Sequence, residues 1–370
     1  MLGLLGAIDV ERAYYHCKAC RRGFHPHDAV LGLDSADATP AAREAIALAG
    51  AVDAFGPAAE VLLERMAGLR VSESTVRRTA EAVGADVGRR LEAGEVFGEA
   101  VDWEWHKDAE GMTCAYVSID ATGTPQQAPD GRSAEGRMCT VAMAYNPVPE
   151  DHERWARPAA RRQPERAARY VASLNGQAAL AEPLRRQAAQ VGMDRADRWL
   201  AISDGGSGLE DWLRTNFPRV EAVILDFFHA AEYLAELAAA WHGAGTDAAE
   251  TCFKTWAHRL KHEGGEVVLT ELRSLDFAGR QGLGDRLRET VTYYENQVHR
   301  MDYPTYTEKG WQIGSGPMEA ACKTVIGRRL KGTGMRWSPQ GADAMAHIRA
   351  LLVGEHGQWT AYWNHLARAA

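Results

Sequence analysis

The 370-residue sequence predicts a mixed α and β protein (α+β / α/β), with a mixed-sheet core that carries an all-helical insertion and follows a helical domain. Three observations lead to this fold class. Short apolar runs at 112–119, 137–145, 199–203 and 220–225 are rich in strand-forming residues. The stretch 230–298 is almost wholly helical in character. The stretch 39–94 divides into three helical segments separated by glycine and proline.

The length allows two or three domains with sizeable cores. We expect a partial zinc-ribbon-like hairpin over 1–35, a helix-turn-helix domain over 36–95, a core over 96–228, an all-helical insertion over 229–302 and the rest of the core over 303–370. The formal net charge of -8 does not by itself indicate a nucleic-acid partner. No stretch has the length of a membrane span, and no secretory pattern is visible, so we expect a cytoplasmic protein without a membrane partner.

The N-terminal segment contains a Cys-x-x-Cys pair, Cys17 and Cys20, between a predicted strand and a second short strand. Two thiolates on such a knuckle supply half of a tetrahedral zinc site. No second Cys-x-x-Cys follows, and His25 and His27 have an unconventional spacing for the other half. One explanation is that the chain begins late and lacks an upstream cysteine pair. The alternative is a plain hairpin with two reduced cysteines.

The next segment has the pattern of a helix-turn-helix. Thr39-Pro40 opens a helix to about Ala54, Gly56-Pro57 starts a second helix that ends before Gly68, and Ser72 precedes a third. The third helix would enter the major groove of DNA, with three candidate contacts: Thr75, Arg77 and Arg78. The alternative is a three-helix bundle with an ordinary charged face.

Two predicted strands are each followed directly by an acid. The run 112–119 ends in Asp120 and is expected to pair antiparallel with 137–145 through a long, loose connection. The stretch 153–190 is expected to be mostly helical. The run 199–203 ends in Asp204, and a helix over 209–216 leads to the strand 220–225, which forms a βαβ-like unit. Asp226 then opens a helix that carries His229.

A third acid lies at the start of a basic helix. Gly314-Ser-Gly-Pro reads as a tight turn, Glu319 falls in the first helical turn, and Lys323 lies on the same face. The cations Arg328, Arg329, Lys331 and Arg336 follow before the next acid. The alternative is a capped surface helix with an ordinary Glu–Lys pair. A last helix is expected from Gln340 to about Gly354, before a packing segment over 359–363.

Asp120, Asp204 and Glu319 together suggest a metal centre. Acids at strand ends on one side of a mixed sheet converge, and two Mg²⁺ or Mn²⁺ ions held by carboxylates can drive phosphoryl transfer. Taken singly, each acid is also compatible with a role as a turn cap. The order of strand acid, strand acid, helical block and helix acid favours the metal centre.

Four motifs carry a resemblance to a known family: Ser118-Ile-Asp120-Ala-Thr-Gly, Ile202-Ser-Asp204-Gly, Asp226-x-x-His229 and Gly314-Ser-Gly-x-x-Glu319-x-x-x-Lys323. The chain resembles insertion-sequence transposases of the DDE type, closest to the ISKra family in the Mutator-like group, over nearly its whole length. The resemblance implies an RNase H-like core, a catalytic triad of Asp120, Asp204 and Glu319, and action as a homo-oligomer on paired DNA ends. The departure lies at the N-terminus, where relatives carry an upstream cysteine pair.

The resemblance leads to the expectation of a DNA transposase that uses Mg²⁺ or Mn²⁺, with Zn²⁺ as a further candidate ligand and double-stranded DNA as partner. Lys323, Arg328, Arg329, Lys331 and Arg336 would hold phosphates. Asp226 and His229 would not hold the metal but would orient the residues that do. Asp226 is also an alternative to Asp204 as the second catalytic acid. Two other functions stay open: a catalytically inactive or domesticated DNA-binding protein, and a metal-dependent nuclease without strand transfer.

Overall fold

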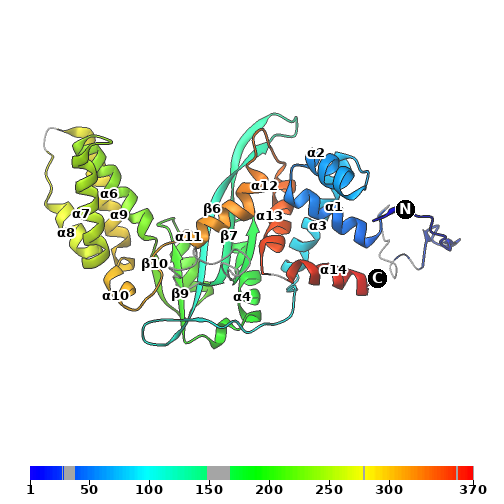
Figure 1. The fold of residues 1–370 in the computed structure, drawn as a ribbon, viewed down its shortest axis with the longest axis horizontal. Coiled ribbons are helices and arrows are strands. Elements are labelled where there is room, and N and C mark those ends of the chain that lie inside the picture. The colour runs from blue at the N-terminus through cyan, green and yellow to red at the C-terminus, as the bar shows by residue number, and fades with distance from the viewer. Residues whose placement is uncertain (27, 29–37, 148–166, 278–279, 356, 370) are drawn as a thin grey trace.

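The computed structural model describes residues 1–26, 28, 38–147, 167–277, 280–355 and 357–369 (Figure 1). At the centre of the described chain lies a six-stranded mixed sheet flanked by helices. Its main strands lie in the order β10 (Val220–Leu225), β9 (Arg198–Ser203), β6 (Thr113–Gln127), β7 (Ser133–Asn146) and β8 (Ala167–Ser173). The short β5 (His106–Lys107) also pairs with β6. Strands β10, β9 and β6 are parallel, whereas β6, β7 and β8 are antiparallel.

The β6–β7 hairpin differs from its prediction. Strand β6 does not end at Asp120, because it continues to Gln127 and pairs with β7 as far as Ser133. The expected long, loose connection is therefore wrong. Pro125 lacks an amide proton, and the ladder shifts register between Thr124 and Gln126, which accommodates the proline in an irregularity. The extended hairpin rises above the sheet (Figure 1).

Strand β8 was not predicted either. The stretch 153–190 was expected to be mostly helical, but 167–173 forms an edge strand that pairs with β7. Residues 148–166 lie outside the described part of the chain. A short helical turn η4 (Gln177–Leu180), helix α4 (Ala181–Gln190) and the turn η5 (Met193–Arg195) then lead to β9. Helix α5 (Leu209–Asn216) connects β9 to β10 and completes the predicted βαβ unit.

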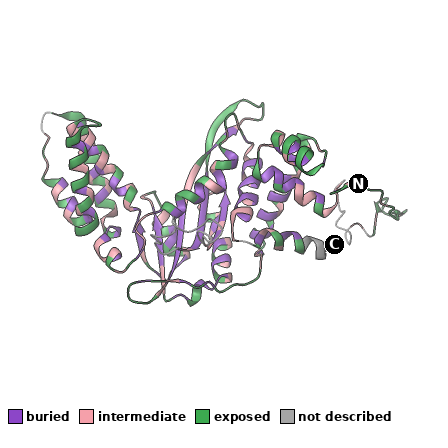
Figure 2. Cartoon of the chain, viewed as in Figure 1, coloured by how far each residue is buried: buried purple, intermediate pink, exposed green. Residues whose placement is uncertain are grey.

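Helices cover both faces of the sheet. One face packs against α13 (Pro339–Val353) and against the helix formed by α11 (Gly316–Ala321), η7 (Cys322–Gly327) and α12 (Arg328–Leu330). The other face packs against α4 and α5. The buried residues concentrate in the strands and in the helices next to them (Figure 2). In the described chain, no helix is both long and apolar enough to cross a membrane.

The helical block and the N-terminal helices lie at opposite ends of the molecule (Figure 1). The block contains α6 (Phe227–His242), α7 (Asp247–Glu263), α8 (Gly265–Ser274) and α9 (Gln281–Gln297). The turn η6 (Val298–Arg300) and α10 (Tyr303–Glu308) return the chain to the core. At the other end lie α1 (Pro40–Val52), α2 (Phe55–Pro57), η1 (Ala58–Met66), α3 (Glu73–Glu92) and α14 (Gln358–Ala369).

The N-terminal helices share a core with the sheet. A small cluster around Ile46, Leu63 and Val76 holds α1, η1 and α3 together. The second half of α3, however, joins the main hydrophobic core and packs closely on α13. At Gly84 the two helices approach so closely that an added Cβ would lie 2.0 Å from the carbonyl oxygen of Ala344. The helices α1 and α3 therefore share one continuous hydrophobic core with the sheet.

Two short antiparallel hairpins form the N-terminal segment. Strands β1 (Leu2–Gly3) and β2 (Gly6–Ala7) pair with each other, and β3 (Tyr15–His16) pairs with β4 (Gly23–Phe24) around the Cys-x-x-Cys turn. The third helix of the next region begins as expected, because the Ser72 hydroxyl accepts a hydrogen bond from the amide of Thr75. Gly68, at φ +69°, forms the turn before it.

Candidate functional site

Asp120 lies on β6, and Asp204 directly follows β9, the parallel strand that neighbours β6. Ser118 of β6 is paired with Ile202 of β9, and each acid follows two residues later. Side chains alternate along a strand, so the two carboxyl groups lie on the same face of the sheet. This is the face covered by α11 and η7. The parallel register brings the first two predicted acids together, although Asp120 lies within a strand instead of at its end.

The surroundings of Asp120 disfavour its negative charge. Burial raises the pKa of this carboxyl group, and the charge of Asp204 raises it further. The amide of Ala121 donates a 2.6 Å hydrogen bond to Asp120, and the thiol of Cys322 lies 3.6 Å from its Oδ2 atom; both contacts favour the ionised form. Two facing carboxylates that repel each other gain from a bound cation.

Asp204 has a more open environment, in a turn that follows β9. Its Oδ1 atom accepts a hydrogen bond of 2.9 Å from the amide of Gly206. Behind the turn, the buried Arg300 donates to the carbonyl oxygens of Ser203 and Asp204. Sequence reasoning missed Arg300, because its distance of 96 positions from Asp204 hides the contact. This arginine ties the end of the helical block to the strand that carries Asp204.

Asp226 is buried and fully engaged. Its side chain is 4% exposed and caps α6 through a hydrogen bond from the amide of Phe228. The hydroxyl of Ser315 donates to Oδ2 at 2.6 Å, and the amide of Ser315 donates to Oδ1 at 3.2 Å. Asp226 therefore fastens the turn that precedes α11 to the end of β10. His229 is not its partner, because Nδ1 of His229 lies 3.5 Å from Glu232.

Glu319 occupies the first turn of α11, as predicted. Its side chain is 52% exposed and pairs with Lys323 at 2.9 Å. Cys322 contacts Asp120, so the helix that carries Glu319 packs against this acid. Within the described ranges, no three His, Cys, Asp or Glu side chains are gathered closely enough to hold a metal ion. The carboxylate pair of Asp120 and Asp204 offers the hard oxygen ligands that Mg²⁺ and Mn²⁺ prefer, while Glu319 faces Lys323.

The continuation of α11 widens into π-helical turns over η7 before α12. Such turns interrupt an α-helix at a cost in regular hydrogen bonding and occur frequently at functional sites. The widened segment contains both Cys322, which contacts Asp120, and Lys323, which pairs with Glu319. The wide turns therefore lie directly at the candidate metal centre.

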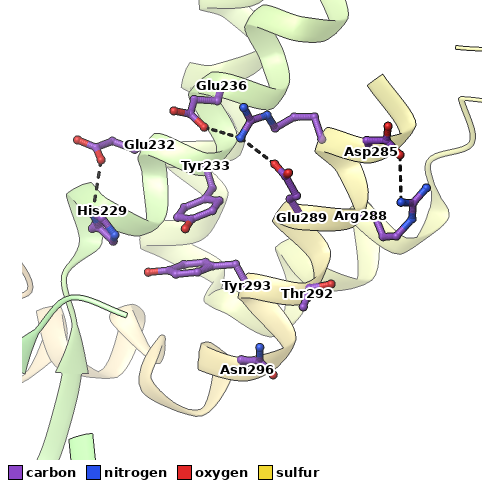
Figure 3. Close-up of a pocket in the computed structure, with 11 residues that line it drawn as sticks. His229, Glu232, Tyr233, Glu236, Asp285, Arg288, Glu289, Thr292, Tyr293 and Asn296 are labelled. Carbon is purple, nitrogen blue, oxygen red and sulfur yellow. Dashed lines mark hydrogen bonds and ion pairs between the residues drawn. The ribbon is translucent and has the colours of Figure 1, made fainter. Parts of the chain in front are cut away.

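A pocket of about 810 Å³ lies between α6 and α9 (Figure 3). His229 lines it, and the rings of Tyr233 and Tyr293 stack within it at 3.9 Å between centroids. Its charged lining comprises four acids and two arginines: Glu232, Glu236, Asp285, Glu289, Arg286 and Arg288. Both arginines are paired with these acids. The pocket therefore has excess negative charge and does not suit a phosphate group.

The predicted phosphate-binding residues separate into exposed and buried groups. Lys323, Arg328, Lys331 and Arg336 are exposed, and Lys331 donates to the hydroxyl of Thr122 on β6. Arg329 is 1% exposed, and its guanidinium lies over the rings of Phe55 and Trp337. It donates to the carbonyl oxygen of Gly50 at 2.7 Å. The prediction that Arg329 contacts DNA is corrected, because this side chain is used inside the fold.

The candidate contacts on α3 lie near its N-terminus. Arg77 and Arg78 are exposed, and Thr75 is partly exposed with its hydroxyl 2.9 Å from that of Ser72. The two arginines, although adjacent, have different neighbours. Burial raises the pKa of the Glu81 carboxyl group, and the nearby positive charges of Arg77 and the buried Arg329 partly oppose this rise. Arg78 lines a hollow between α1 and α3.

Cys17 and Cys20 form a knuckle between β3 and β4. The amide of Cys20 lies 3.5 Å from the sulfur of Cys17, and hydrogen bonds from Cys20 and Ala19 lower the pKa of the Cys17 thiol. Thiolates are the form that binds zinc, so this half-site suits the metal. His25 instead has Nδ1 at 3.1 Å from the carbonyl oxygen of Ala13, and His27 lies outside the described residues.

Comparison with known proteins assigns no family to the chain. No protein-family model matches the sequence, and a search of curated proteins finds no significant match. The function assigned to the chain therefore depends on its motifs and on the geometry of the site.

Proposed function

We propose that the protein is a DDE-type DNA transposase with an RNase H-like core, which cleaves strands at the ends of an insertion sequence and joins them to target DNA. The observation that carries the proposal is that Asp120 on β6 lies close to Asp204, which directly follows the adjacent parallel strand β9, so that their charges interact. The helix that carries Glu319 contacts Asp120 through Cys322 and so supports a third ligand nearby.

In this proposal Asp120 and Asp204 hold the first Mg²⁺ or Mn²⁺ ion, and Glu319 completes the set after it leaves Lys323. The metal supplies activation of water or of a 3′-hydroxyl and stabilisation of the leaving oxygen. The thiol of Cys322 and the amide of Ala121 favour the ionised form of Asp120 and would orient it. Lys323, released from Glu319, is then available for a phosphate of the DNA.

The choice between Asp204 and Asp226 follows the same geometry. Asp204 is partly exposed and interacts electrostatically with Asp120. Asp226 is buried, and both of its oxygens accept hydrogen bonds from Ser315 or Phe228. A metal ligand needs free lone pairs that face the ion. These observations favour Asp204 as the second catalytic acid and Asp226 as a positioning residue.

Double-stranded DNA is the proposed partner. Lys323, Arg328, Lys331 and Arg336 are exposed on, or shortly after, the helix that carries Glu319, and α3 presents the exposed Arg77 and Arg78. Action as a homo-oligomer in the cytoplasm belongs to the same proposal. The knuckle of Cys17 and Cys20 would hold Zn²⁺ as half of a larger site.

The test is strand cleavage of labelled duplexes taken from the DNA that flanks the gene, with Mg²⁺ or Mn²⁺. Wild-type protein is expected to nick in the presence of metal. Asp120→Asn should abolish nicking and retain DNA binding, because it removes a metal ligand but no cation. Asp211→Asn, which neutralises an exposed acid on α5, is the matched control and should remain active. Nicking that persists in Asp120→Asn would contradict the mechanism.

One observation favours a second candidate function, that of a DNA-binding protein without catalysis. Glu319 is paired with Lys323, and the described side chains form no three-ligand metal cluster. A protein that binds duplex DNA with the same affinity with and without Mn²⁺, and never nicks it, has this second function. A nuclease without strand transfer would instead produce nicks but no joined products.

A further inference from the structure

We propose that the hollow between α1 and α3 binds the phosphodiester backbone of double-stranded DNA through Arg43, Arg70 and Arg78. The inference deepens the proposed function, on which it depends, and assigns two arginines, Arg43 and Arg70, that the motifs do not indicate. It also gives Arg78 and Thr75 a different role from the predicted contacts with base edges.

The hollow has the charge that a polyanion requires. Its volume is about 590 Å³, and its polar lining consists of three arginines and three hydroxyl groups: Arg43, Arg70, Arg78, Ser72, Thr75 and Thr79. Among the described residues, no carboxylate lines it. This composition contrasts with the acid-rich pocket between α6 and α9. Arginines and hydroxyls without a competing acid form a suitable environment for phosphate oxygens.

The three arginines come from three separate segments. Arg43 lies on α1, Arg70 lies in the turn before α3, and Arg78 lies on α3. Along α3, Thr75, Arg78 and Thr79 recur at the spacing of one helical face, so they face the hollow together. Arg77 lies on a different side, close enough to Glu81 to influence its carboxyl group. The two adjacent arginines therefore serve different surfaces.

The start of α3 adds to the positive field. Ser72 caps this 20-residue helix, and Ser72 and Thr75 both line the hollow, so the positive end of the helix dipole lies at its edge. The hydroxyls of Ser72 and Thr75 lie 2.9 Å apart, and whichever of the two accepts in this contact keeps its own proton for a further acceptor. Hydroxyls and arginines together form the mixed donor set that phosphate contacts use.

One ion pair at the rim competes with the proposed ligand. Arg70 contacts Glu64 at 3.1 Å, and the two side chains are 86% and 48% exposed. Such an exposed pair contributes little and exchanges readily for a phosphate. Removal of Glu64 should therefore strengthen DNA binding, whereas removal of Arg70 should weaken it. Opposite effects from the two partners of one ion pair are not expected if the pair serves only the fold.

The experiment measures binding of the full chain to a fluorescein-labelled 30-bp duplex of random sequence by fluorescence anisotropy, from 50 to 200 mM KCl. We expect Arg43→Gln and Arg70→Gln each to raise the Kd about three- to ten-fold and to lower the salt slope by about one. Glu64→Gln should lower the Kd. Arg288→Gln, which removes an exposed arginine from an ion pair with Asp285 on α9, is the matched control and should leave the Kd unchanged.

The outcomes separate the inference from the proposed function. Unchanged Kd and salt slope in both Arg43→Gln and Arg70→Gln, with wild-type protein that still binds DNA, overturn the inference and leave the proposed function intact. Wild-type protein that binds no duplex overturns both. Arg70 is largely exposed, so Arg70→Gln retains the fold even if Arg43→Gln does not.

Free phosphate compounds are a second source of the same chemistry. Inorganic pyrophosphate at millimolar concentration should not displace the duplex beyond the effect of equal ionic strength, because it lacks the repeated spacing of a DNA backbone. Displacement that is strong in wild-type protein and lost in Arg70→Gln would identify a site for a small phosphate ligand and overturn the assignment to DNA.

Discussion

The hydroxyl of Ser315 donates a 2.6 Å hydrogen bond to the buried carboxylate of Asp226, and its amide donates a second one. This contact fixes the turn before α11 and with it the position of Glu319. We predict that Ser315→Ala reduces nicking while duplex binding is unchanged. Its stability should fall by about 1.5–3 kcal/mol, because a hydrogen bond to a charged group is lost. Urea unfolding and the nicking assay measure the two effects.

The control for Ser315 is Ser274→Ala. Ser274 is an exposed residue at the end of α8 whose hydroxyl donates to the carbonyl oxygen of Glu271. Its loss should change neither nicking nor stability beyond about 0.5 kcal/mol. Equal behaviour of the two variants would show that the contact between Ser315 and Asp226 does not position Glu319.

Lys323 pairs with Glu319 at 2.9 Å, and under the proposed function this pair competes with a metal ion for the Glu319 carboxylate. Lys323→Ala should therefore lower the Mn²⁺ concentration for half-maximal nicking about two-fold, because an exposed pair of this spacing is worth only about 0.3–0.5 kcal/mol. The assay is run at saturating DNA, since the same change weakens phosphate binding. Lys254→Ala removes an equivalent pair with Glu250 on α7 and should have no effect. A higher metal requirement in Lys323→Ala would count against Glu319 as a ligand.

Arg328 and Arg329 are adjacent, but substitution should affect different properties: stability at Arg329 and DNA binding at Arg328. Burial, with the nearby charge of Arg349, lowers the pKa of Arg329 to about 10, so it stays charged at neutral pH between Phe55 and Trp337. Arg329→Met should cost about 3 kcal/mol or more, because the carbonyl oxygen of Gly50 loses its donor and a packed group is removed. Arg328→Gln should leave stability within about 0.5 kcal/mol and weaken DNA binding. Thermal melts and anisotropy distinguish them.

Gly84 permits the close approach of α3 and α13. Gly84→Ala should destabilise the protein by about 2 kcal/mol or more, because its Cβ would lie 2.0 Å from the carbonyl oxygen of Ala344 and would force the helices apart. Gly284→Ala, on α9, is the matched control, since no atom lies within 4 Å of its added Cβ. Helix propensity predicts that this control gains about 0.5–1 kcal/mol. Chemical denaturation measures both, and a neutral Gly84→Ala would contradict the packing argument.

Asp343 should make stability depend on pH below 4. Burial opposes its ionisation, but contacts with His347, Leu174 and Ser173 outweigh burial and lower its pKa to about 2. A lowered pKa means that the folded state favours the carboxylate, so the stabilisation is present above the unfolded value and is lost as the pH falls from about 4 to 2. Asp343→Asn should cost about 1–2 kcal/mol at pH 7, allowing for solvent screening.

Urea unfolding from pH 7 down to pH 3 tests the role of Asp343. The difference in the free energy of unfolding between Asp343→Asn and wild-type protein should become smaller as the pH falls below 4. A difference that stays constant down to pH 3 would show that charge is not the source of the stabilisation by Asp343.

Much of the fold follows from local sequence signals. The apolar runs predicted β9 and β10 almost to the residue, and Ser72 caps the third N-terminal helix as expected. Strand β8 was missed because alanine and arginine favour helices, whereas here pairing with β7 determines the conformation. Arg169 within β8 is buried through contacts with Phe97, Gln190 and Glu355, which no local pattern reveals.

The candidate site was only partly visible in the sequence. Asp120 and Asp204 could be predicted to meet, because parallel strands place successive acids at one edge. The contact of Cys322 with Asp120 spans 202 positions and depends on how η7 packs over β6. Burial alone distinguishes Arg329 from Arg328, and burial depends on Phe55 and Trp337, which are distant from each other in the sequence.

The packing of α3 on α13 has a consequence for the distance along the DNA between the bound segment and the cleaved bond. Helix α3 begins at the basic hollow and ends inside the core that supports Asp120, without a flexible linker between them. Under the proposed function, the fixed distance between the basic hollow and Asp120 therefore determines the number of base pairs between the bound segment and the cleaved bond. A DNA end with one extra base pair would present its scissile phosphate rotated and displaced. Because α3 packs directly on the core, the bound segment and the candidate metal centre would not shift relative to each other to compensate.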